Sequence, residues 1–245
     1  EARRAGRPGP AGRFPPPQGR GRPPLVRPAP DPVPRRLTAA PGRATPGAAP
    51  PETGLRMTDA FAFLAARRSV PARMLAAPAP DERALRPILA AALRVPDHGK
   101  LEPWRLVVIE GPALQRLAGL VATRGAALAL DAEQVEKARG TWAAAPLIVA
   151  VVARPAPHAK IPEREQLLSA GALCLSLVNA ALAAGWGAAW LTGWPAYDRA
   201  FVEGGLGLAP TESVAGLVHI GTAPAELPAD RRRPDLSGCV TRIAT

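Results

Sequence analysis

The chain of 245 residues has room for one large domain, and its hydrophobic content of 47% allows a sizeable core. The formal net charge of +11 is concentrated at one end, because residues 1–56 hold 11 arginines against three acidic residues and so carry +8. Residues 57–245 carry only +3, and a nearly neutral domain is a poor candidate for binding nucleic acid.

Residues 1–56 form a segment rich in proline and arginine. They hold 15 of the 31 prolines and almost no large apolar side chains, so we expect the segment to be disordered. Three interpretations stay open: a polyproline-II interaction tail, an arginine-rich arm for nucleic acid, or translated upstream sequence or a plain linker, which the composition favours. Met57 directly precedes the first helical pattern, and we interpret it as the physiological start of a domain over 57–245.

The cysteines and the N-terminal segment restrict the class of protein further. There are two cysteines, and no CxxC or Cys/His cluster exists, so the sequence supports neither a zinc site nor a redox disulfide. The segment before residue 57 has no apolar stretch of the kind that signal peptides contain. Few cysteines in a chain of this size fit a reducing compartment, and we therefore expect a cytoplasmic protein.

From residue 58 onward the chain shows regular helical and strand patterns. Thr58 is a suitable N-cap, and apolar residues at helical spacing follow the turn Pro80-Asp81-Glu82. Residues 146–153 read PLIVAVVA, a continuous apolar run typical of a strand buried on both faces. In chain order, the patterns predict a helix over 59–67, a helix from 80 to the loop at 95–99, a strand over 104–110, helices over 112–120 and 131–142, a strand over 146–153, a helix over 163–185, a strand over 188–191, a helix near 197–202 and a strand over 213–221.

The order of these elements indicates the fold class. Helices and strands do not alternate strictly, which favours an α+β fold over a doubly wound parallel sheet. No GxGxxG follows the first predicted strand, so a Rossmann-type nucleotide site is not indicated. The helix over 163–185 is apolar nearly all round, but it contains Ser169, Ser176 and Asn179. We interpret it as a core or subunit-interface helix and not as a membrane span.

The first stretch suited to binding a ligand is Arg67, Arg68 and Ser69, directly after the first predicted helix. Two guanidinium groups and a hydroxyl can clamp a phosphate, because guanidinium pairs bidentately with phosphate oxygens. Taken alone, two arginines at the end of a helix more often just complement the helix dipole.

Two further stretches carry candidate binding residues. The polar loop RVPDHGKLEPW, from 94 to 104, offers Arg94 and His98 between a helix and a strand, although a lone histidine there is more often a surface or capping residue. The stretch GWGAAWLTGW, from 185 to 194, holds three of the five tryptophans. Aromatic planes beside glycines can border a flat ring system, and ordinary core packing explains them equally well.

Taken in order, these motifs resemble the nitroreductase family, and most closely its short, single-domain bacterial members. RRS at 67–69 is followed by RVPDHGKLEPW, the strand AAPLIVAVVA, a helix with EQLLSAG, the stretch AAGWGAAWLTG and finally VAGLVHIGTAP. The resemblance covers the chain from about residue 58 to its end, and PDHxxxxPW with RRS upstream is its most specific part.

The resemblance implies an α+β fold in which helices sandwich an antiparallel-rich sheet, and a homodimer with the long central helix at the interface. It also implies FMN in clefts built from both subunits, with NADH or NADPH as reductant. Leu191 and Thr192 depart from the more polar pair expected there, which leaves the substrate preference open. The implied FMN contacts are Arg67, Arg68 and Ser69 at the phosphate and ribityl end, Trp190, Leu191 and Thr192 along the isoalloxazine, and Arg94 and His98 of the partner subunit; the implied NAD(P) contacts are Ala180, Ala181, Leu182, Ala183, Ala184 and Gly185.

The implied activity is a ping-pong transfer of hydride from NAD(P)H, through the flavin, to an electron-poor small molecule such as a nitroaromatic or a quinone. The flavin carries the difficult chemistry, which agrees with the lack of a Ser/His/Asp or paired-carboxylate constellation in the sequence. Two alternatives remain open: other flavin chemistry on the same fold, or a nonenzymatic flavin- or RNA-binding protein that works through the arginine- and proline-rich tail.

Overall fold

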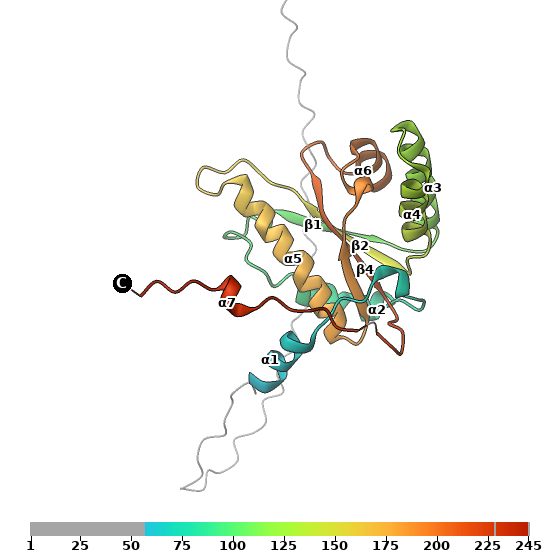
Figure 1. Ribbon diagram of the computed structural model, residues 1–245. Helices are drawn as coiled ribbons and strands as arrows, with labels where there is room; N and C mark the ends of the chain where they lie inside the picture. Colours follow the sequence, from blue (N-terminus) through green and yellow to red (C-terminus); the bar gives the residue numbers. More distant parts are fainter. Residues whose placement is uncertain (1–56, 228, 245) are drawn as a thin grey trace, which may run out of the picture. The chain divides into compact units, whose positions relative to one another are not determined.

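A four-stranded sheet organises the part of the chain that the computed structural model describes, residues 57–227 and 229–244 (Figure 1). The expectations for residues 1–56 lie outside this part. The strands are β1 (Trp104–Ile109), β2 (Leu147–Ala153), β3 (Gly187–Leu191) and β4 (Ser213–Gly221). Their order across the sheet is β1-β2-β4-β3, and each neighbouring pair is antiparallel. The predicted α+β class with an antiparallel sheet is confirmed.

Helices cover both faces of this sheet. The predicted helices all form, and one of them is longer than predicted, since α3 continues seven residues beyond 120. Its extension packs on α4, where Gly125 leaves no room for a Cβ beside Val135. The helices are α1 (Met57–Ala66), α2 (Glu82–Ala92), α3 (Pro112–Ala127), α4 (Ala132–Ala143), α5 (Glu163–Ala183), α6 (Arg199–Leu206) and α7 (Leu236–Cys239), with the short 3-10 turns η1 (Ala72–Met74) and η2 (Trp194–Ala196).

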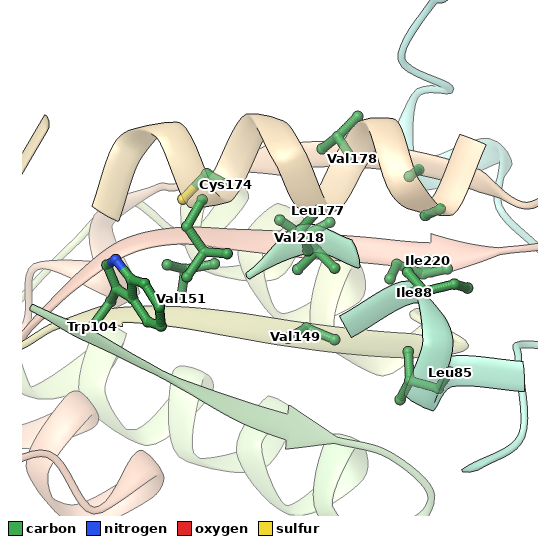
Figure 2. Packing of buried hydrophobic residues seen from close by; sticks show 14 of the residues in the cluster. Leu85, Ile88, Trp104, Val149, Val151, Cys174, Leu177, Val178, Val218 and Ile220 are labelled. Atoms are coloured by element: carbon green, nitrogen blue, oxygen red, sulfur yellow. The ribbon is translucent and has the colours of Figure 1, made fainter. Parts of the chain in front are cut away.

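Two hydrophobic cores fill the spaces between the sheet and its helices. All seven residues of β2 are buried, as the run PLIVAVVA predicts, because successive side chains of a strand point to opposite faces. Val149 and Val151 point toward α2 and α5, whereas Ile148 and Val152 point toward α3 and α6. Figure 2 shows the first core, in which Leu177 of α5 lies close to the two central strands.

The long helix α5 buries one face and leaves the other open. Its buried face includes Leu173, Cys174 and Leu177 of the first core, in agreement with the predicted core helix. On its outer face, Leu168 and Leu175 are exposed by 65% and 47%. Of the helices described, α5 is the one whose length and composition would allow it to cross a membrane.

Candidate functional site

The outer edge of β3 is where the candidate site forms. The chain leaves α1, and the backbone N–H of Val70 donates to the carbonyl of Ala188 in β3 at 2.9 Å. A little further on, Ala76 and Thr222 exchange two backbone hydrogen bonds of 3.0 and 2.8 Å. These bonds hold the segment 67–76 beside β3 and the end of β4, so that residues far apart in sequence become neighbours.

A cavity of about 970 Å³ opens at this edge. Its volume lies within the range of small-molecule and cofactor sites, roughly 300–1,000 Å³. Two of the three candidate stretches of the sequence meet in its wall, one from the segment after α1 and the other from β3. The predicted site residues that line it are Arg67, Arg68, Ser69, Trp190 and Leu191.

Arg67 has an unsatisfied donor in this cavity wall. Its Nη2 donates to Ser69 Oγ at 3.3 Å, but its Nε is buried without a hydrogen-bond partner among the described residues. A buried donor without an acceptor is unfavourable by about 1–3 kcal/mol, and more for a charged group. An anionic ligand next to Arg67 and Arg68 would supply the missing acceptor, so the residues present fit a phosphate group.

Trp190 provides an aromatic surface at the same cavity. Its side chain is 41% exposed, and the indole lies close to Gly216 of β4 and Gly171 of α5. Larger residues at position 216 would collide with the ring. An indole held in this way can border a flat ring system, as the tryptophan-rich stretch predicts.

The remaining predicted contacts do not line this cavity in the single chain. His98 lies in the loop after α2, where its Nε2 is 2.9 Å from the carbonyl oxygen of Glu165 in α5. Arg94 begins the same loop, and Thr192 is exposed just beyond β3. Of the predicted NAD(P) stretch, Leu182 lines a second cavity of about 280 Å³, which it shares with Arg67 and Arg68. The other members of that stretch, Ala180, Ala181, Ala183, Ala184 and Gly185, line neither cavity.

The structure adds lining residues that the sequence did not indicate. Most of them come from η1 and α4, from the residues next to these two elements, and from the segment after residue 228, all outside the motifs; Ala189 belongs to the tryptophan-rich stretch but was not among its predicted contacts. Thr141 on α4 contributes a hydroxyl, and several of the others are basic. These additional lining residues are Pro71, Ala72, Arg73, Lys137, Gly140, Thr141, Ala144, Ala189, Ala229, Asp230, Arg231 and Arg233.

Three further observations concern the metal-ligating and titratable side chains among the described residues. No group of three or more histidine, cysteine, aspartate or glutamate side chains is placed there to hold a metal ion. Burial raises the pKa of the Cys174 thiol to about 12, which keeps it protonated and unreactive, as expected for a small core residue. Burial also lowers the pKa of His219 to about 4, so that this histidine is neutral at pH 7.

Comparison with known proteins agrees with this arrangement. The model of the nitroreductase family matches residues 64–222. The chain is 34% identical over 183 residues to the Escherichia coli (strain K12) protein named "Putative NAD(P)H nitroreductase YdjA", with 75% of this chain and 98% of that protein covered. It is 36% identical over 186 residues to a Haemophilus influenzae protein named "Putative NAD(P)H nitroreductase", with 76% of this chain and all of that protein covered.

Solved structures show the same fold. A nitroreductase-like family protein from Bacillus cereus aligns with a TM-score of 0.64 at 22% identity, covering 75% of this chain and 95% of that one. The FMN and NADPH-dependent nitroreductase NfnB from Sphigopyxis sp. strain HMH aligns with a TM-score of 0.62 at 20% identity, covering 76% and 99%. The chain belongs to the nitroreductase family, and it is an oxidoreductase of that family.

Proposed function

We propose that this protein is an FMN-dependent oxidoreductase that takes hydride from NADH or NADPH and reduces an electron-poor small molecule such as a nitroaromatic or a quinone. The observation that carries this proposal is the meeting of Arg67, Arg68 and Ser69 with Trp190 at one cavity. The lining of that cavity contains both an arginine whose buried Nε has no hydrogen-bond partner among the described residues and a tryptophan that is 41% exposed. Membership of the nitroreductase family supports the same activity.

In this proposal each end of the cofactor has its own residues. Arg67, Arg68 and Ser69 hold the phosphate and the ribityl chain, because they supply charged and hydroxyl donors from one short segment. Trp190 and Leu191 line the isoalloxazine. When bound, FMN accepts a hydride from the reduced nicotinamide and passes the electrons on to the acceptor. The protein's part is to bind, orient and surround these groups.

The open cavity also suggests the order of events. In this proposal the reductant and the acceptor stack in turn on the same face of the flavin, so the oxidised nucleotide must leave before the acceptor binds. We therefore expect ping-pong kinetics. The proposal requires no side chain as an acid or a base, and the one carboxylate among the described lining residues, that of Asp230, is paired with Arg233.

The protein is proposed to act as a homodimer through the outer face of α5. Leu168 and Leu175 are exposed there, and the side-chain Oδ1 of Asn179 is buried without a partner in the described part of one chain. A second copy packed on this face would cover the leucines and could satisfy the amide. His98 is fixed to the same helix through Glu165, so Arg94 and His98 of the partner subunit would complete the FMN site.

The test is an absorption spectrum of the purified full-length chain. We expect flavin bands in the visible region, released as FMN on denaturation, and oxidation of NADH or NADPH when a nitroaromatic or a quinone is added. A folded, colourless protein that does not take up added FMN would overturn the proposal. Purification from a soluble cytoplasmic fraction and a dimeric mass in solution are the matching expectations for location and assembly.

A further inference from the structure

The cavity carries more positive charge than one flavin phosphate requires. Of its described lining residues, Asp230 is the one acid, and its carboxylate pairs with Arg233 at 3.0 Å. The basic side chains in the lining come from three separate parts of the chain: the segment 67–76, α4 and the C-terminal segment. They are Arg67, Arg68, Arg73, Lys137, Arg231 and Arg233.

Besides Arg67, three of these side chains have no carboxylate partner among the described residues. Arg73 of η1, Lys137 of α4 and Arg231 of the C-terminal segment form no ion pair within the described part of the chain. All three are exposed, whereas Arg67 and Arg68 are partly buried, and we take the side of the cavity where the exposed cations lie as its mouth. Cations gathered around one opening repel each other and raise the local potential, an arrangement that attracts an anionic ligand.

The charges of the proposed ligands indicate what these three residues bind. The FMN phosphate carries about −2 at pH 7, which Arg67 and Arg68 can balance. A nicotinamide placed against the flavin leaves the adenosine half of the dinucleotide to extend toward the mouth of the cavity. NADH and NADPH differ in this half alone, since NADPH carries an additional phosphate on the adenosine ribose. Guanidinium groups are the side chains best suited to bind such a phosphate.

We propose that Lys137 and Arg231, assisted by Arg73, bind the ribose 2′-phosphate of NADPH and make NADPH the preferred reductant. The inference rests on the proposed function, because it assigns the reductant of the same site. It does not involve Arg67 and Arg68, which hold FMN. The preference arises from charge at the mouth of the cavity, so it should weaken as the salt concentration rises.

The test uses flavin-loaded full-length protein and two ligands that differ in one phosphate. Adenosine 2′,5′-bisphosphate and adenosine 5′-monophosphate are titrated separately by calorimetry at low salt. We expect the bisphosphate to bind about 10- to 100-fold more tightly, the range for one or two charge-assisted hydrogen bonds. The double variant Lys137→Ala/Arg231→Ala should lose most of this difference, and its ratio of kcat/KM for NADPH over NADH should fall by a similar factor.

Arg232→Ala is the matched control, because Arg232 is an exposed arginine of the same segment that does not line the cavity. It should keep the difference between the two nucleotides. Equal affinity of the flavin-loaded wild type for both nucleotides, or an equal loss in the control, overturns the inference. Flavin content measured on the same samples separates the two proposals, since a wild-type protein without FMN contradicts the proposed function itself.

Discussion

The indole of Trp190 lies against the α-carbon of Gly216 on the neighbouring strand. A Cβ at position 216 would overlap Trp190 Nε1 and would stand 2.8 Å from Cys174 Sγ. Because β4 carries no side chain here, the ring can fold back over the sheet, and Gly216 sets how far it stands out at the cavity.

Gly216→Ala is therefore expected to change the cavity indirectly, by displacing the side chain of Trp190. The added methyl group must push the indole outward, into the region proposed for the isoalloxazine, or distort the sheet. We expect weaker FMN binding together with a loss of about 1–3 kcal/mol in the free energy of unfolding, the usual range for overpacking. Flavin content after purification and urea unfolding followed by tryptophan fluorescence measure the two effects.

Gly204→Ala provides the control for this variant. Gly204 lies in α6, and no heavy atom lies within 4 Å of a Cβ built there. Alanine in a helix is more favourable than glycine by about 0.5–1 kcal/mol, so the control should be slightly more stable and keep its flavin. If Gly216→Ala retains full flavin and wild-type stability, Gly216 does not position Trp190.

Removing the two guanidinium groups of Arg67 and Arg68 should remove the cofactor. Each charge-assisted hydrogen bond contributes about 1.5–3 kcal/mol, so the double variant Arg67→Ala/Arg68→Ala should bind FMN at least about 100-fold more weakly. Neither arginine belongs to a hydrophobic core, and we expect the variant to stay folded. Equilibrium dialysis against FMN and circular dichroism check these expectations.

Comparing the FMN affinity of His98→Ala with that of the double arginine variant ranks the proposed FMN contacts. His98 does not line the cavity of its own chain, and in the proposed dimer it approaches the flavin of the other site. Its loss should weaken FMN binding less than the loss of the two arginines does. Equal weakening in both variants would mean that the ranking is wrong, and a double arginine variant that stays fully yellow would refute the phosphate clamp.

The sequence predicts the sheet well, because its strands have simple signals. The run PLIVAVVA needs no partner to be recognised as a buried strand, and β2 is indeed buried along its whole length. The end of α3 was predicted too early, since residues 121–127 read VATRGAA and have little helical periodicity. Their helix is held by tertiary contact, with Val121 in the core and Gly125 against Val135.

The site could be predicted only in part. Arg67 and Trp190 belong to recognisable motifs, and the bond between Val70 and Ala188 brings the two stretches together. Lys137 and Arg231 are single charged residues on exposed segments, and in sequence they look like ordinary solvated side chains. Only the packing of α4 and of the C-terminal segment around the edge of β3 brings them to one cavity.

Buried His219 should make the protein less stable in mild acid. Its side chain is 2% exposed between its cross-strand partners Ile148 and Ala189, and burial lowers its pKa from 6.5 to about 4. Between these two pH values the unfolded state binds a proton that the folded state does not bind. The free energy of unfolding therefore falls as the pH drops from 6.5 to about 4. Over this whole range the free energy of unfolding falls by about 3 kcal/mol. Urea unfolding of wild type and His219→Gln at pH 7 and pH 4.5 tests this, and parallel losses in the two proteins would contradict it.

The ion pair between Arg105 and Glu212 should make the free energy of unfolding depend on pH in a lower range than His219 does. Glu212 accepts from Arg105 Nε at 2.7 Å and Nη2 at 2.8 Å, and this pairing, opposed by partial burial, lowers the pKa of the carboxyl from 4.5 to about 2. The stabilisation is complete above pH 4.5 and is lost as the pH falls toward 2. Because Arg105 remains about one-third exposed, solvent screening reduces the contribution, and we expect Glu212→Gln to lower the free energy of unfolding by about 1–2 kcal/mol at pH 7.

The control for this ion pair is Glu136→Gln, which removes a fully exposed carboxylate paired with Arg139 on the same helix. It should leave the urea midpoint unchanged at pH 7, because exposed pairs of this kind add little to stability. The difference between wild type and Glu212→Gln should shrink below pH 4.5, where wild-type Glu212 begins to be protonated in the unfolded state, and it should persist between pH 6.5 and 4.5. A difference that stays constant down to pH 2 would contradict the assignment to the carboxylate of Glu212, whereas the protonation of His219 affects both proteins equally and cancels in the comparison.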